Sequence, residues 1–170
     1  MTFLKGLSLV LLVVMLSGCG YKMVGKETHL PPGVSSVAIP TFKSRTLEPG
    51  IEIPFTQAFL NEFILDRRIK VVDRDEADAV LEGVIKSYEY YSIAYDRSGL
   101  ALEYRATAVV DLTLRRRSGE VIWKENDLSE TRTYRTSLSG VGTESNKNVA
   151  LVQIGRLMAG RIRNRFFYNF

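Results

Sequence analysis

The sequence predicts an α+β fold, a two-layer sandwich in which two helices pack on one face of a mixed, mainly antiparallel four-stranded sheet. Apolar residues recur with a helical period in two separate segments, and alternating or β-branched runs joined by turn residues lie between these segments. Both helices need a sheet face to cover their apolar stripes, which favours two layers. The 170 residues, 45% of them hydrophobic and 25% charged, are sufficient for one core.

Two short segments near the start of this region predict strands. Residues 37–42 read VAIPTF, a β-type run in which Pro40 indicates an edge or the end of a strand. Residues 69–72 read IKVV, a second short strand that follows the first predicted helix.

The first helix is predicted over residues 52–68. Phe55, Phe59 and Phe63 stand at positions i, i+4 and i+8, so they share one face that we expect to be buried. Pro54 suits the first turn of a helix, where its missing N–H leaves no bond unmade.

Three long strands in hairpins follow, at residues 80–95, 104–114 and 121–135. The turn signatures Asp96–Gly99 and Arg116–Glu120 separate them. In the middle strand the residues that face one way are aromatic or aliphatic: Tyr104, Ala106, Ala108, Val110, Leu112 and Leu114. Polar residues alternate with them, so we expect an antiparallel strand with one buried face.

The last helix is predicted over residues 145–167, with Ser145 as its N-cap. Its apolar residues recur at helical spacing: Leu151, Ile154, Met158 and Ile162. The Ser-, Gly- and Asn-rich residues 136–148 predict a loop, and Gly140–Gly142 within it is expected to be flexible rather than to cradle a phosphate, since the glycine and lysine spacing of such motifs is missing.

The first eighteen residues predict an export signal that is removed. Lys5 supplies the positive charge, an apolar run too short to span a membrane follows, and small residues come next. Leu16–Cys19 fits the bacterial lipobox, a leucine and two small residues before a cysteine, so Cys19 is the expected site of lipid attachment. The alternative is an ordinary signal peptide with a chance cysteine at its cleavage site.

This prediction divides the chain into three parts. Residues 1–18 are the signal, residues 19–34 the lipidated N-terminus and tether, and residues 35–170 a single α+β domain. Two or three acyl chains hold a protein almost permanently on a membrane. Because Gly20, not Asp, follows the cysteine, sorting to the outer membrane is expected, with the domain facing the periplasm.

The sequence offers few groups for catalysis. His29 is the only histidine, so a catalytic triad or a histidine-based metal site lacks its parts, and the single cysteine is assigned to lipid. The carboxylates at residues 73–78 lie in a charged turn, where a solvated loop is the simpler interpretation. We therefore expect no enzymatic activity, no metal and no cofactor.

Binding is the remaining function class. The 23 basic residues exceed the 19 acidic ones, and Arg97, Arg115–Arg117 and Lys147 are expected in exposed positions where they can contact phosphates. Solvated surface charge is the alternative for each. Five tyrosines crowd the first hairpin, more than one core face needs: Tyr88, Tyr90, Tyr91, Tyr95 and Tyr104. An exposed aromatic surface that docks on a partner is therefore expected.

Five short motifs occur in sequence along the chain. They are Cys19-Gly20-Tyr21, Ile39-Pro40-x-Phe42, Glu48-Pro49-Gly50-Ile51-Glu52, Ala77-Asp78-Ala79-Val80-Leu81-x-Gly83 and Arg97-x-Gly99-x-x-x-Glu103-Tyr104. In this order, and together with the lipobox, they resemble the LptE family of outer-membrane lipopolysaccharide-assembly lipoproteins. The similarity covers essentially the whole chain after the signal.

The resemblance implies a noncatalytic role and two helices on a four-stranded sheet. Family members plug the β-barrel protein LptD in a one-to-one complex, support its assembly and bind lipopolysaccharide during its insertion into the outer leaflet; no nucleic acid is involved. The motif places Arg97 as the first candidate for phosphate contact. The resemblance implies a second candidate site at the loop before the last helix, and Lys147 is the cation nearest to that loop. The alternative function is a periplasm-facing lipoprotein that carries lipid or scaffolds another envelope complex.

Overall fold

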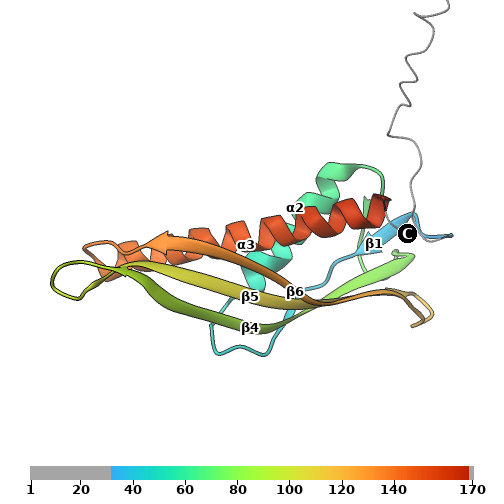
Figure 1. Cartoon of the computed structure of the whole chain (residues 1–170). Coiled ribbons are helices and arrows are strands. Elements are labelled where there is room, and N and C mark those ends of the chain that lie inside the picture. Colours follow the sequence, from blue (N-terminus) through green and yellow to red (C-terminus); the bar gives the residue numbers. More distant parts are fainter. Residues whose placement is uncertain (1–31, 169–170) are drawn as a thin grey trace, which may run out of the picture.

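The computed structural model describes residues 32–168 and shows an elongated molecule of two layers (Figure 1). The predicted signal, Cys19 and most of the tether lie outside the described residues. The elements are β1 (Ser36–Ala38), β2 (Lys43–Ser44), α2 (Glu52–Asp66), β3 (Lys70–Val71), β4 (Ala79–Tyr95), β5 (Ala101–Arg116), β6 (Val121–Arg135) and α3 (Gly140–Tyr168). Both helices lie on the same side of the three long strands, as predicted.

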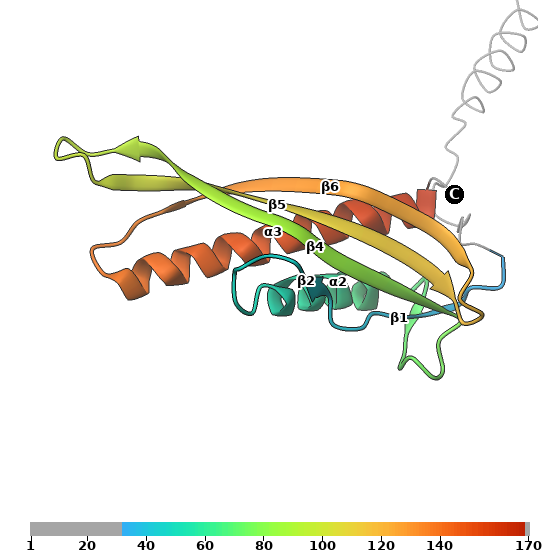
Figure 2. The same ribbon diagram turned by 90° about the horizontal axis from the view of Figure 1, so that it is seen from below.

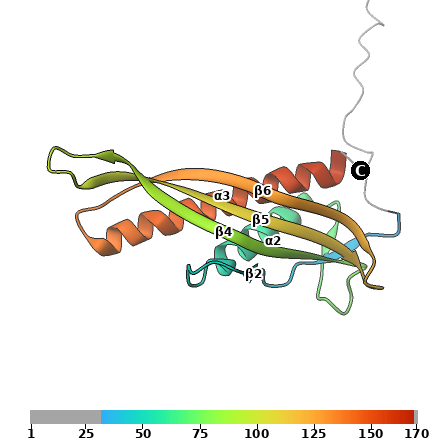
Figure 3. The ribbon, with the colours of Figure 1, turned by 60° about the horizontal axis from the view of Figure 1, so that its bottom comes forward.

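The sheet has six strands, so the prediction of four mainly antiparallel strands was wrong. Its order is β3-β1-β4-β5-β6, and β2 pairs separately with β4. The pairs β1–β3, β1–β4 and β2–β4 are parallel, and β4–β5–β6 forms the expected antiparallel meander. Figure 3 shows the short strands along the β4 side of the meander. β1 and β3 overlap the short strands predicted at residues 37–42 and 69–72, whereas β2 has only two residues and is too short to show a period in the sequence.

The space between sheet and helices is filled by one apolar core. The β5 residues that face the helices are fully buried: Ala106, Ala108, Val110, Leu112 and Leu114. Phe55, Phe59 and Phe63 of α2 are fully buried in the same core, which confirms the predicted stripe. Phe59 also contacts the Phe42 ring, and Gly83 of β4 makes room for that ring, since a Cβ there would lie 2.4 Å from it.

Helix α3 begins five residues earlier than predicted, so both the Ser145 cap and the loop at Gly140–Gly142 were wrong. The hydroxyl of Ser139 accepts a hydrogen bond from the Gly142 N–H at 3.1 Å, which is N-cap geometry. The glycines, poor helix formers, hid this start from propensity reasoning. The predicted stripe Leu151, Ile154, Met158 and Ile162 is buried, and Phe166 continues it.

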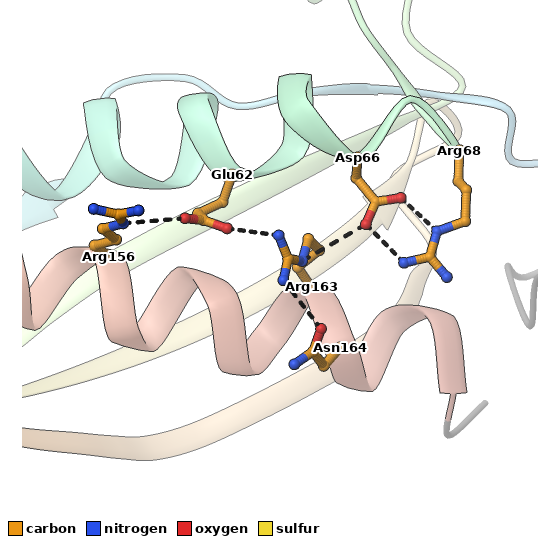
Figure 4. A network of polar contacts seen from close by, with 6 residues as sticks. All are labelled: Glu62, Asp66, Arg68, Arg156, Arg163 and Asn164. Atoms are coloured by element: carbon orange, nitrogen blue, oxygen red, sulfur yellow. Dashed lines mark hydrogen bonds and ion pairs between the residues drawn. The ribbon is translucent and has the colours of Figure 1, made fainter. Parts of the chain in front are cut away.

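The two helices are joined by a row of alternating charges (Figure 4). Glu62 of α2, almost fully buried, accepts a hydrogen bond from Arg163 at 2.8 Å and lies 3.6 Å from Arg156. Asp66 is bound by Arg68 at 2.7 Å and lies 3.6 Å from Arg163. Each carboxylate is therefore shared by two guanidinium groups, and the row fixes the register of α3 on α2.

One aspartate fastens the first strand to the meander. The carboxylate of Asp78 accepts four hydrogen bonds, from the N–H and the hydroxyl of both Ser35 and Ser36, at 2.8–3.0 Å. The bonds from Ser35, then those from Ser36, lower the pKa of Asp78 to about 2. Asp78 therefore stays charged in the folded protein and holds β1 beside the start of β4.

Candidate functional site

The β4–β5 hairpin projects past the N-terminal end of α3, at the end of the molecule opposite β1 (Figure 2). Its tip is a turn that one side chain orders by hydrogen bonds. Asp96 Oδ1 accepts hydrogen bonds from the Ser98 hydroxyl at 2.6 Å, the Ser98 N–H at 2.8 Å and the Leu100 N–H at 3.0 Å. Gly99 takes a positive φ of 82°, which glycine adopts without strain. The hydrogen bonds from Ser98 and Leu100 lower the pKa of Asp96, so its charge is stabilised within the turn.

Arg97 is presented at the apex of this turn, and its side chain is exposed. Among residues 32–168, no carboxylate lies within salt-bridge distance of its guanidinium group. A guanidinium group offers a planar set of donors that fits phosphate oxygens. Arg97 is therefore an exposed cation on an ordered turn, and its contact with a phosphate stays a prediction.

Lys147 lies in the first third of α3, and the expectation that it is exposed was wrong. Its ammonium group is 2.7 Å from Glu48 and 2.8 Å from Glu144, and only 13% of its side chain is exposed. Burial works against the charged form, but the hydrogen bonds to Glu144 and Glu48 outweigh it and raise the pKa of Lys147. The charge of Lys147 is thus already balanced by two carboxylates, and the structure does not bring it together with Arg97 in one open site.

The tyrosines divide into two groups. Ring contacts run across the three long strands from Tyr88 to Tyr90 to Tyr104 to Tyr134, with centroids 5.9, 5.7 and 5.5 Å apart. Tyr134 is buried, and burial raises its pKa to about 12. Tyr90, together with Tyr91 and Tyr95, is more than half exposed. Part of the cluster is therefore packing, and part is an exposed aromatic surface on the hairpin, as predicted.

Arg105 is a further exposed cation that the sequence did not single out as a candidate binding residue. The register pairs it with Tyr91, and its guanidinium group donates to the Tyr91 hydroxyl at 3.4 Å on the sheet face away from the helices. The side chain is exposed and approaches no carboxylate of the described region within salt-bridge distance. Only the strand register, which includes bulges near residues 86 and 93, reveals this pairing, so no sequence signal could have found it.

The sheet face away from the helices is polar. Thr107 and Thr131 share a hydrogen bond of 2.9 Å across β5 and β6. Lys86 is 2.6 Å from Asp127 and 3.6 Å from Asp111, and Arg115 is 3.2 Å from Glu82. Both helices lie on the other side of the three long strands, so no helix of the described region covers this face (Figure 2), and it suits a hydrated or polar environment.

Residues 32–168 contain neither a group of metal ligands nor a membrane-spanning helix. No three His, Cys, Asp or Glu side chains among them are placed to hold a metal ion. None of the helices in the same part of the chain is both long enough and apolar enough to cross a membrane. His29 and Cys19 fall outside the described residues.

The fold first defines a class, the two-layer α+β domains seen in several solved lipoproteins. A putative lipoprotein from Caulobacter crescentus has a TM-score of 0.53 at 11% identity, over 74% of this chain and 87% of that one. A minor lipoprotein from Acinetobacter baumannii has a TM-score of 0.52 at 14% identity, over 80% and 92%. Lipoprotein B from Nitrosomonas europaea has a TM-score of 0.52 at 18% identity, over 84% and 87%.

The family then follows from the sequence. The family model LptE, described as lipopolysaccharide-assembly, matches residues 34–166. Because this match covers most of the chain, the protein belongs to the LptE family, and the resemblance predicted from the motifs is confirmed. A comparison with curated proteins gave no match.

Proposed function

We propose that this protein is a noncatalytic lipoprotein of the outer membrane, anchored through Cys19, that plugs and helps to assemble an LptD-like β-barrel. In that complex it binds lipopolysaccharide during insertion of the lipid into the outer leaflet. Arg97 contacts a phosphate group of the lipid. Family membership supports the assembly role. The observation that carries the binding role is the exposed Arg97 on an ordered turn, where no carboxylate of residues 32–168 lies within salt-bridge distance.

The shape of the molecule supports a plug. Its long axis follows the three long strands, and the polar open face of the sheet suits the hydrated interior of a barrel. The hairpin with Arg97 lies at one end, and β1, into which the tether leads, lies at the other (Figure 2).

The alternative, a carrier that encloses lipid, is less well supported. A carrier needs an apolar cavity for acyl chains. The space between the two layers is filled instead by fully buried side chains such as Phe55, Phe59 and Phe166. Lys147 remains a second candidate contact, but a phosphate would have to displace Glu48 or Glu144 from its ammonium group.

Purification of the lipidated full chain from membranes in mild detergent tests the plug. We expect a β-barrel protein in a one-to-one complex. Recovery of the chain alone, under conditions in which the barrel itself stays folded, would contradict the proposal. A variant with Cys19→Ser, which removes the anchor but no residue of the α+β domain, serves as the control for association that depends only on sharing a membrane.

A further inference from the structure

Exposed apolar side chains precede and follow Arg97 in the sequence of the projecting hairpin. Leu100 and Leu102 are 67% and 47% exposed, and Tyr95, before the turn, is 61% exposed. Hairpin tips are ordinarily polar, and packing in this fold does not explain two exposed leucines directly after a cation and an exposed tyrosine before it. The hairpin therefore combines a cation at its apex with an apolar flank directly beside it.

The positions of these side chains are fixed by the turn. The same Asp96 carboxylate oxygen that orders the backbone around Arg97 also accepts the Leu100 N–H at 3.0 Å, and the Asp96 N–H donates to the Leu100 carbonyl at 2.9 Å. Arg97 and Leu100 are thus held on one rigid unit. A ligand that contacts both gains from a surface that needs little ordering on binding.

A second segment of the chain extends the apolar flank. The Thr136 N–H donates to the Leu102 carbonyl at 3.0 Å, so the connection between β6 and α3 begins beside Leu102. Two residues further along, Leu138 is fully exposed. Two segments distant in sequence therefore add exposed leucines to the same end of the molecule.

We infer that Leu100 and Leu102 bind the acyl chains of the same glycolipid whose phosphate Arg97 contacts. An acyl chain is the expected ligand of the leucines because a cation lies on the same turn. A molecule with an anionic head and an apolar tail matches this combination of a cation and an apolar flank. This inference rests on the proposed lipopolysaccharide binding and adds which part of the lipid each residue contacts.

The test compares two probes, a phosphorylated and acylated glucosamine disaccharide and its deacylated form with the same phosphates. Binding is measured with the full chain, immobilised in detergent. We expect the wild type to prefer the acylated probe by about tenfold, since two partly exposed leucines become buried. The double variant Leu100→Ser and Leu102→Ser should bind both probes equally. Arg97→Ala should weaken both by the same factor.

Matched variants separate the preference for the acylated probe from misfolding and from nonspecific hydrophobic binding. Val121→Ser removes an apolar side chain of similar exposure, 45%, from the other end of the sheet and should keep the preference. Leu100→Met with Leu102→Met should keep it as well. A serine double variant that is folded and retains the preference overturns the inference, as does equal binding of the wild type to plain phospholipid vesicles. A serine double variant that still prefers the acylated probe but no longer associates with the β-barrel protein would show that the leucines contact a protein partner. This result also overturns the inference.

Failure of the proposed function gives a different result. In that case the wild type binds neither probe, and no comparison between variants remains.

Discussion

The body of the molecule and its projecting hairpin are built on different principles. In the body, the helices cover the sheet, aromatic residues fill the interlayer space, and charged groups are paired across the helix interface. On the hairpin, the helix layer ends, and Arg97, Leu100 and Tyr95 are exposed although the backbone beneath them is well ordered by Asp96. Stability is concentrated where the layers overlap, and the surface available for binding lies where the overlap stops.

The largest expected effect concerns the core. Phe166 is fully buried, with its ring 5.5 Å from that of Phe63 and 4.9 Å from that of Trp123, so it joins α3 to both α2 and β6. Phe166→Ala should lower the free energy of unfolding by about 3–5 kcal/mol. Urea denaturation measures this. Tyr95→Ala on the hairpin is the control and should change it by less than about 0.5 kcal/mol; a comparable loss there would contradict the division between body and hairpin.

A smaller effect is expected at the charge row between the helices. Glu62→Ala leaves the partly buried Arg163 guanidinium group without its closest carboxylate, so the free energy of unfolding should fall by about 2 kcal/mol. Arg156→Ala, at a side chain that is 76% exposed, should cost about 0.5 kcal/mol or less. Equal losses for the two variants would show that the row acts through surface charge alone.

On the hairpin, the effect should appear in binding and not in stability. Arg97→Asp should weaken lipopolysaccharide binding at least about tenfold, because an attractive charge becomes a repulsive one. Arg117→Asp makes the same change on the exposed β5–β6 turn at the other end and should leave binding unchanged. If both variants bind alike, or if Arg97→Asp binds as the wild type does, the role of Arg97 is refuted. The denaturation curves of both should match that of the wild type.

The smallest effect is a pH dependence at the joint of β1 and β4. The pKa of Asp78 falls from its ordinary 3.8 to about 2 in the folded protein, so its stabilising effect is complete above pH 3.8 and is lost as the pH falls toward 2. Asp78→Asn should therefore lower stability at pH 6 but lose less of it between pH 4 and pH 2. Urea titrations at several pH values measure this, with Asp75→Asn, on the exposed loop beside it, as the control. An unchanged pH dependence in the Asp78 variant would show that these hydrogen bonds do not hold the strand.

The strongest sequence predictions were those with a long period. Phe55, Phe59 and Phe63 were assigned to the core by spacing alone, and so were Leu151, Ile154 and Met158. The three long strands and both turns between them were also confirmed. Of the short parallel strands, β1 and β3 overlap the predicted runs at residues 37–42 and 69–72, but β2 was not predicted, because Lys43 and Ser44 become a strand only through their hydrogen bonds to β4.

The sequence by itself determined the two helices, the meander, the LptE family and the position of Arg97 in a tight turn, because each of these is encoded within a few neighbouring residues. Only the tertiary structure decided that Lys147 is balanced by Glu48, 99 residues away, and that Tyr91 lies beside Arg105. It also decided that the hairpin extends past α3 and leaves Leu100 and Leu102 uncovered. Such facts depend on which distant segments meet and where the layers end, and local patterns in a sequence contain neither.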